Sequence, residues 1–379
     1  MTQLSRKIIE KVRTHRALFG LLILGAVLFV IFPQLNHQTV IETFYVNNNL
    51  DQDLASTLPP SKQNVSEKPV YYAVFCSNTP NGVSYRTYDY AYNLPLTALA
   101  WERIGFKSIA IIIGSRCEWE NDPALSVVLS HLEARRATAI FVPAPLEYRT
   151  TLSQTARAFA VNLPGFPGKD NDFLITSDSD LWPLRKEHYT PLPNYKIHFV
   201  HAGCCGTFTI NNKTYPMYAM SNIGATVASW RQIMNENHPI ATDAEGMLDY
   251  FGEIFGDQAR SPVVVGKETW YMDQRGVSIR LAEWMDKYGN SSAYRVSDKG
   301  FERLDRTGWD ADKLVPENFT IRFDAHLPGK GFLPVQWKKI VPLINLMYGN
   351  NSWEARWAEE YTLSFLAKVE NFVRFGDLG

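Results

Sequence analysis

One segment decides the expected fold: residues 172–183 read Asp-Phe-Leu-Ile-Thr-Ser-Asp-Ser-Asp-Leu-Trp-Pro. Phe173–Thr176 is rich in apolar and β-branched side chains and too short for a helix, so it predicts a buried strand. Asp178 and Asp180 follow it directly, and Pro183 ends the segment. In an open α/β sheet, ligands bind at the carboxyl ends of the strands. The two carboxylates are therefore expected to face a crevice.

This carboxylate pair suits Mg²⁺ or Mn²⁺ carrying a diphosphate, because such ions take a few protein oxygens and fill their other positions with phosphate and water. The spacing alone is not specific, since it recurs at Asp51/Asp53, Asp170/Asp172 and Asp310/Asp312. Only Asp178 and Asp180 follow a strand-like run. A polar turn that ends a strand is the other interpretation.

The composition is that of a globular protein. The chain has 379 residues, of which 45% are hydrophobic, enough for one large α/β domain or two smaller ones. A net charge of -1 argues against nucleic acid as a partner. Four cysteines are too few for a disulfide scaffold and lack paired zinc-ligand spacing. A Cys76–Cys117 bridge and buried thiols both stay open. The sequence gives no indication of an oligomeric state.

The N-terminus predicts a membrane anchor. Five basic side chains and one acidic side chain precede an apolar run from Ala17 to Phe32. We expect a cytoplasmic tail (1–16), a transmembrane signal anchor (17–35), a polar stem (36–68) and one lumenal domain (69–379). A cleaved signal peptide is the alternative. Five glycosylation sequons agree with a lumenal chain: Asn64, Asn212, Asn290, Asn318 and Asn350.

Strand and helix patterns alternate from Pro69 onward. The expected strands are Val70–Phe75, Ile109–Ile113, Ala139–Val142 and Phe173–Thr176, and the expected helices between them are Leu94–Ile104, Leu125–Arg136 and Leu152–Asn162. This order predicts an α/β fold with a mostly parallel, doubly wound sheet and helices on both faces.

The pattern loosens after Pro183. A strand is expected at Lys196–Val200, and helices are expected at Ala225–Met234, Asp243–Phe251, Ser278–Tyr288 and Ser352–Phe375. The last helix has an apolar stripe that should pack on the domain.

The strand-Asp-x-Asp segment, with an anchor and stem before it, resembles the GT-A glycosyltransferases of the Golgi. Three later segments are similar to the glycogenin-like retaining (family 8-like) group: Tyr218–Thr226 followed by Trp230-Arg231, Tyr271-Met272-Asp273-Gln274, and His326–Phe332, which reads HLPGKGF. The resemblance spans roughly residues 70–332. It implies a single-pass type II Golgi membrane protein with a Rossmann-like GT-A domain. Residues 69–183 would form the nucleotide-sugar half and residues 184–379 the acceptor half.

The resemblance also implies an activity, namely transfer of a sugar from a nucleotide sugar, expected to be a UDP-sugar, to a glycan, protein or lipid acceptor. Asp178, Asp180 and His326 would hold Mn²⁺ (or Mg²⁺), since mixed oxygen and nitrogen ligands favour Mn²⁺. Gly329 allows close approach of the backbone to a phosphate, and Lys330 supplies a positive charge.

The remaining candidates would contact the donor or acceptor. Asn222 and Gly224 could hold sugar or acceptor hydroxyls in a polar turn. Asp273 and Gln274 are the expected catalytic residues: Asp273 as a base or as a contact to the donor sugar, and Gln274 as a stabiliser of an oxocarbenium-like centre.

Tyr85 and Arg86, with Tyr88 beside them, would contact the nucleotide base and ribose-diphosphate. Arg275 stands where the group has a second Asp, and the lysine after His326 is one residue closer than usual. Retention is expected, and inversion stays open.

Two other classes fit parts of the pattern. Strand-Asp-x-Asp also opens haloacid-dehalogenase-type phosphatases, but that family wants Thr or Val where this chain has Trp182. Its motif also starts the domain, whereas here it follows three predicted strand–helix units. The third possibility is a lumenal, non-catalytic module that binds carbohydrate or nucleotide.

Overall fold

The computed structural model describes residues 68–81, 87–310 and 314–376. The expected tail, span and stem therefore lie outside the described residues, apart from Lys68. Within the described ranges, no helix is both long enough and apolar enough to cross a membrane. The membrane anchor stays a prediction.

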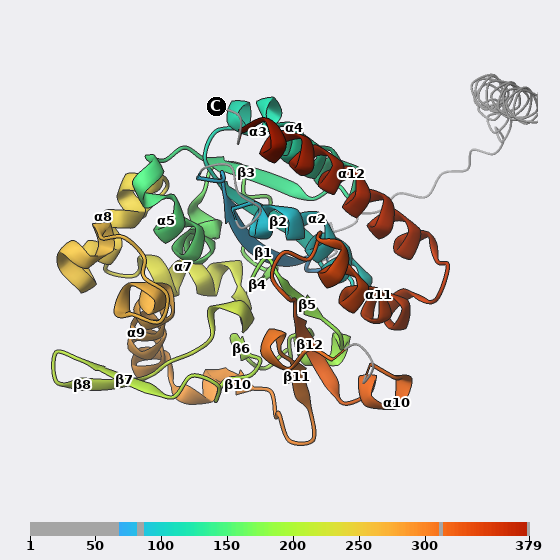
Figure 1. Cartoon of the computed structure of the whole chain (residues 1–379). Helices are drawn as coiled ribbons and strands as arrows, with labels where there is room; N and C mark the ends of the chain where they lie inside the picture. Colours follow the sequence, from blue (N-terminus) through green and yellow to red (C-terminus); the bar gives the residue numbers. More distant parts are fainter. Residues whose placement is uncertain (1–67, 82–86, 311–313, 377–379) are drawn as a thin grey trace, which may run out of the picture. The chain divides into compact units, whose positions relative to one another are not determined.

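A seven-stranded sheet forms the centre of the domain (Figure 1), in the order β10-β6-β9-β4-β1-β2-β3. The strands are β1 (Tyr71–Asn78), β2 (Lys107–Ile113), β3 (Thr138–Val142), β4 (Phe173–Thr176), β6 (Ile197–Phe199), β9 (Ile223–Thr226) and β10 (Ala293–Arg295). β1 to β4 lie where the sequence predicts strands, and they pair in parallel. The predicted mainly parallel sheet is confirmed.

One strand departs from the prediction. β9 runs antiparallel to both of its neighbours, β4 and β6. A helix was expected from Ala225, but the chain stays extended to Thr226 and α7 (Val227–Asn235) follows. The β-branched Ile223 and Thr226 favour an extended backbone. Thr226 also caps α7, since its side chain accepts a hydrogen bond from the Ser229 amide, and so the helix cannot begin earlier.

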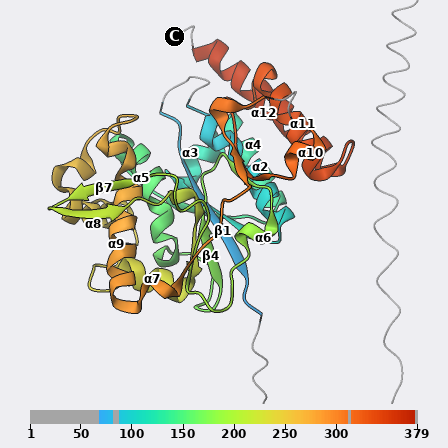
Figure 2. The same cartoon turned by 90° about the horizontal axis from the view of Figure 1, so that it is seen from below.

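Helices cover both faces of the sheet (Figures 1 and 2). α2 (Asp89–Arg103), α4 (Pro123–Ala134) and α12 (Trp353–Gly376) lie on one face, and α5 (Arg149–Thr155), α7 and α9 (Met272–Tyr288) lie on the other. Ala73 and Phe75 of β1 join the first core, whereas Tyr72 and Val74 join the second. Alternate side chains of a strand point to opposite faces, and both faces are covered, which explains why β1 is apolar over consecutive residues from Tyr72 to Cys76.

The described part of the chain has five further α-helices: α3 (Arg116–Asn121), α6 (Lys186–Tyr189), α8 (Ala244–Phe255), α10 (Pro316–Phe319) and α11 (Pro334–Tyr348). The expected packing of the C-terminal helix is confirmed, because Tyr361, Phe365 and Val369 of α12 are fully buried in the first core.

Three predicted helices begin or end at clearly different residues. The helix expected at Leu94–Ile104 begins earlier, as α2 at Asp89. The expected helix Leu152–Asn162 is instead α5 continued by a 3₁₀ segment, η3 (Ala156–Asn162). α9 begins at Met272 rather than at Ser278, so Asp273 lies in its first turn and not before it. A negative side chain in a first turn is stabilised by the helix dipole, which favours this earlier start.

A three-stranded sheet brings distant parts of the chain together. It contains β11 (Glu302–Leu304), β12 (Arg322–His326) and β5 (Leu181–Pro183), in that order. β12 and β5 are antiparallel, with His326 opposite Leu181. The Leu327 amide donates to the Asp180 carbonyl over 2.8 Å. A separate hairpin joins β7 (Thr207–Ile210) and β8 (Lys213–Pro216).

The cysteines do not form the bridge that the sequence left open. Cys76 is a buried free thiol in β1, and Cys117 is an exposed free thiol on α3. A disulfide instead joins the adjacent residues Cys204 and Cys205.

Candidate functional site

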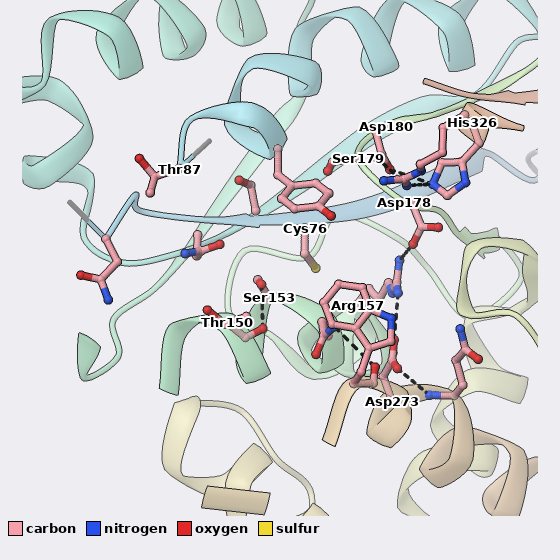
Figure 3. A pocket seen from close by; sticks show the side chains of 18 residues that line it. Cys76, Thr87, Thr150, Ser153, Arg157, Asp178, Ser179, Asp180, Asp273 and His326 are labelled. Atoms are coloured by element: carbon pink, nitrogen blue, oxygen red, sulfur yellow. Dashed lines mark hydrogen bonds and ion pairs between the residues drawn. The ribbon is translucent and has the colours of Figure 1, made fainter. Parts of the chain in front are cut away.

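A pocket of ≈ 420 Å³ lies at the carboxyl ends of β1 and β4 (Figure 3). This is the edge of the sheet at which ligands bind in open α/β folds. Five of the residues singled out in the sequence line it: Asp178, Asp180, Asp273, Gln274 and His326. Segments that are distant in the chain thus converge on one cavity.

Asp178, Asp180 and His326 form a cluster that could hold a metal ion. One ligand atom from each lies within 4.8 Å of the others. His326 Nε2 is 3.4 Å from Asp180 Oδ1. Two carboxylates and an imidazole suit a divalent cation such as Mn²⁺, so the residues fit the expected metal.

The backbone of the Asp178–Asp180 turn is fixed by its neighbours. The Leu181 amide donates to the Asp178 carbonyl over 3.2 Å, which closes the turn. The Thr97 hydroxyl donates to the Ser179 carbonyl, and Trp182 Nε1 donates to the same hydroxyl over 3.2 Å. Trp182 is buried beneath the turn. The backbone that carries the two carboxylates is therefore held in place by the core.

Asp180 and His326 each shift the pKa of the other toward its charged form. Burial favours the neutral acid, but the charges of His326 and Arg306 lower the pKa of Asp180 to about 2. Burial also opposes a charged imidazole, but the Asp180 carboxylate raises the pKa of His326 to about 9. A metal ligand must be a neutral imidazole, so metal uptake would release a proton from His326.

Arg157 is a central member of the site that the sequence analysis missed. It lies in η3 beneath the pocket and is buried. Its Nη1 contacts Asp178 and donates to the Ser177 carbonyl over 2.8 Å, and its Nη2 donates to Asp273 Oδ2 over 2.9 Å. Figure 3 shows it between the two acids. Burial opposes its charge, yet these carboxylates raise the pKa of Arg157. An arginine inside an apolar helical segment was the available signal.

Asp273 and Gln274 differ in how their polar atoms are used. Asp273 is 3% exposed, and burial raises its pKa despite the contact with Arg157. Oδ1 of Asp273 accepts a hydrogen bond from the backbone N–H of Gln274 over 2.7 Å, so both carboxylate oxygens have partners. Gln274 Oε1, in contrast, is buried without a hydrogen-bond partner in the described part of the chain.

Asn222 and Gly224 are not among the residues that line the pocket. Asn222 is 1% exposed. With its amide oriented so that both polar atoms have partners, its oxygen accepts from Arg303 Nη2 at 2.8 Å. Gly224 lies within β9, where an added Cβ would overlap the Phe173 ring. Close packing in the sheet explains this glycine without a ligand.

Gly329 and Lys330 follow β12 and are exposed, and neither lines the pocket. The Lys330 backbone is left-handed, with φ 57, and its amide donates to Asp89 Oδ1 over 2.6 Å. Asp89 lies in the first turn of α2. The segment after His326 is thus attached to the helix that borders the pocket.

The expected base-binding residues Tyr85 and Arg86 lie outside the described residues. Tyr88 is buried, and its hydroxyl donates to Asp122 Oδ2 over 2.7 Å, so it is a core residue and not a contact for a base. Tyr90, two residues later, lines the pocket instead and is 40% exposed.

No known family model matches the chain, and no curated protein does. Among solved structures, the chain is similar to the crystal structure of a glycosyltransferase involved in the glycosylation of the major capsid of PBCV-1. The identity is 12% and the TM-score is 0.29, and the match covers 57% of this chain and 92% of that chain. A likeness at this level carries no argument about function, which must come from the site itself.

Proposed function

We propose that this protein is a metal-dependent GT-A glycosyltransferase. It would move a sugar from a nucleotide sugar, expected to be a UDP-sugar, to a glycan, protein or lipid acceptor. The observation that carries the proposal is the meeting of the Asp178–Asp180–His326 cluster with the buried Arg157–Asp273 ion pair in one pocket. A volume of ≈ 420 Å³ lies in the range of small-ligand sites.

The metal end of the pocket would bind the diphosphate. Mn²⁺ or Mg²⁺ held by Asp178, Asp180 and His326 would stabilise the negative charge that builds on the diphosphate as the sugar leaves. The core beneath the turn fixes the carboxylates, so little reorganisation is needed when charge develops. Gly329 and Lys330 are proposed as further phosphate contacts, because they follow His326 directly.

The α9 end of the pocket would hold the transferred sugar. Arg157 orients Asp273, and both oxygens of that carboxylate are already in use. Asp273 is therefore better suited to orient a sugar hydroxyl than to take a proton. The unpartnered oxygen of Gln274 is suited to an electron-poor anomeric carbon. These two observations support retention, with inversion through Asp273 as the alternative.

The nucleoside is proposed to lie near the start of α2. Tyr85 and Arg86 remain the proposed contacts to the base and ribose-diphosphate, and Tyr90 adds an aromatic side chain in the pocket lining. Asn222 and Gly224 remain proposals for sugar or acceptor contacts, although the packing of both residues already has a structural explanation.

We also propose the topology that the sequence predicts, a type II Golgi membrane protein with a lumenal catalytic domain. Positive charge before the apolar run of residues 17–32 supports this orientation. The sequon asparagines Asn212, Asn290 and Asn350 are all exposed, as glycan acceptors must be.

The test is nucleotide release by the full-length chain with a panel of nucleotide sugars and Mn²⁺, with and without added sugar acceptors. We expect release from one donor class and none from Asp180→Asn. Binding of nucleotide or sugar without release would indicate a non-catalytic module. Release of inorganic phosphate from phosphomonoesters, with no action on nucleotide sugars, would indicate a phosphatase.

A further inference from the structure

Arg306 contacts two of the three side chains that would hold a metal ion. It begins the 3₁₀ turn η8 (Arg306–Gly308), just after β11. Its Nη2 donates to Asp180 Oδ2 over 2.9 Å and also contacts His326 Nε2. A side-chain cation therefore offsets part of the negative charge in the cluster.

A guanidinium and a divalent ion cannot share these atoms. Ions such as Mg²⁺ bind their ligands at about 2.0–2.1 Å, and an ion held by this cluster would need the Nε2 atom of His326 that Arg306 now contacts. Two cations this close would also repel each other strongly in a partly buried pocket. Arg306 must leave His326 before an ion can bind all three ligands.

The surroundings of Arg306 allow such a movement. Its side chain is 35% exposed, whereas that of Arg157, which bonds a backbone carbonyl, is 9% exposed. The Tyr90 hydroxyl also bonds Arg306, and both side chains line the pocket. Within the described residues, the contacts of the Arg306 guanidinium are to the side chains of Asp180, His326 and Tyr90, so it can turn into the cavity without breaking a helix or a strand.

We propose that Arg306 is an exchangeable counter-cation, which neutralises Asp180 in the absence of ligands and pairs with the donor diphosphate once metal and nucleotide sugar bind. This inference rests on the proposed function. A displaced guanidinium left unpaired in the pocket would be costly. The incoming diphosphate is the natural new partner, because a planar guanidinium forms two parallel hydrogen bonds with phosphate oxygens.

The proposed exchange predicts that one substitution, Arg306→Ala, changes the affinity for Mn²⁺ and the affinity for UDP in opposite directions. Arg306→Ala removes a competitor of the metal, so Mn²⁺ alone should bind roughly 2- to 5-fold more tightly, which corresponds to one modest surface-type charge interaction. The same variant loses a charge-assisted contact to the diphosphate, so UDP in saturating Mn²⁺ should bind at least about tenfold more weakly. If Arg306 had only a structural role, its substitution would weaken both Mn²⁺ binding and UDP binding.

The experiment measures Mn²⁺ affinity by electron paramagnetic resonance and UDP affinity by calorimetry on the full-length chain. Arg306→Ala is compared with Arg306→Gln, which keeps length and hydrogen bonding but removes the charge. The matched control is Arg116→Ala, since Arg116 is an exposed arginine on α3 that pairs with Glu120 away from the pocket. Thermal unfolding reports whether each variant is folded.

Tighter Mn²⁺ binding and weaker UDP binding in both Arg306 variants, with no change in the control, are the expected results. Unchanged or weaker Mn²⁺ binding in a folded variant would overturn the competition, and unchanged UDP binding would overturn the transfer to the diphosphate. A wild-type chain that binds neither Mn²⁺ nor UDP contradicts the proposed function itself and removes this inference with it. Failure of the Arg306 inference can therefore be told apart from failure of the proposed function.

Discussion

Arg157 Nη2 donates a hydrogen bond to Asp273 Oδ2 over 2.9 Å, and both side chains are buried. The same guanidinium contacts Asp178 through Nη1. One buried cation therefore ties the turn after β4 to the first turn of α9. The proposed metal-binding end and the proposed sugar-binding end of the pocket are thus connected through one side chain.

The first prediction concerns this buried ion pair. Arg157→Met would leave the carboxylates of Asp178 and Asp273 without their shared partner in the protein interior. Loss of one member of a buried ion pair typically costs about 3–5 kcal/mol, so the free energy of unfolding should fall by roughly that amount. Urea denaturation of the full-length chain measures it.

Arg231→Met is the matched control, because Arg231 pairs with the exposed Asp170 on the protein surface. Removal of such a surface pair should change the free energy of unfolding by about 0–1 kcal/mol. Equal effects of the two substitutions would show that the Arg157 bridge contributes nothing special to stability.

The second prediction is metal dependence. Asp178→Asn and Asp180→Asn each remove one negative ligand from the cluster, so Mn²⁺ binding and nucleotide release should fall together. Loss of a group that stabilises transition-state charge typically costs about 10²–10³-fold in kcat. Asp170→Asn, in the same Asp-x-Asp spacing but exposed, should leave both quantities unchanged. Turnover that persists in a folded Asp180→Asn variant would remove the central assignment.

Much of this arrangement could be predicted from the sequence. The apolar run of β4 and the acids after it predicted the strand, its edge and two of the three residues of the Asp178–Asp180–His326 cluster, because these signals are local. His326 was found through its resemblance to a family segment, and its place beside Asp180 follows from the pairing of β12 with β5. The parallel order of β1 to β4 followed from alternating strand and helix patterns.

Features set by tertiary packing escaped prediction. Arg157 and Arg306 acquire their roles only when segments far apart in the chain meet. The charge of Arg157 within an apolar segment is a weak local signal, and no local pattern marks Arg306. The Ile223–Thr226 segment carries both strand and helix-cap signals. It forms a strand because it pairs with β4 and β6. Gly224 resembled a ligand-binding turn, but its lack of a side chain makes room for the Phe173 ring.

The third prediction is a pH dependence of stability at Asp89. Burial raises the pKa of Asp89 from 3.8 to about 6, although the Lys330 amide opposes the shift. Because the folded state binds the proton more tightly, this group's stabilising contribution is present below pH 3.8 and is lost as the pH rises to about 6. Asp89→Asn keeps an oxygen for the Lys330 amide but cannot titrate.

The melting temperature of Asp89→Asn relative to wild type should therefore increase between about pH 4 and pH 7, by roughly 2–5 °C, and then level off. Scanning calorimetry in EDTA measures the difference with no metal bound near the cluster. A difference that stays constant across this range would show that Asp89 does not titrate as its burial requires.

The fourth prediction tests topology. In microsomes that contain the full-length chain, everything after the predicted span of residues 17–35 should be protected from added protease, and the tail of residues 1–16 should be removed. Endoglycosidase should shift the mobility of the chain if the exposed sequons carry glycans. Digestion of the C-terminal helix in intact microsomes would contradict the lumenal assignment.

The last prediction separates the two stereochemical courses. Under retention, Asp273 orients the donor sugar and Gln274 lies near the anomeric carbon, so the product keeps the configuration of an α-linked donor. Under inversion, Asp273 acts as the base, and Asp273→Asn should cost about 10²–10⁴-fold in kcat with KM little changed. The engaged oxygens of Asp273 favour retention, with Gln274→Ala costing more than Gln274→Asn. An NMR spectrum of the product decides the question, because a β-linkage formed from an α-linked nucleotide sugar would refute retention and make Asp273 the catalytic base.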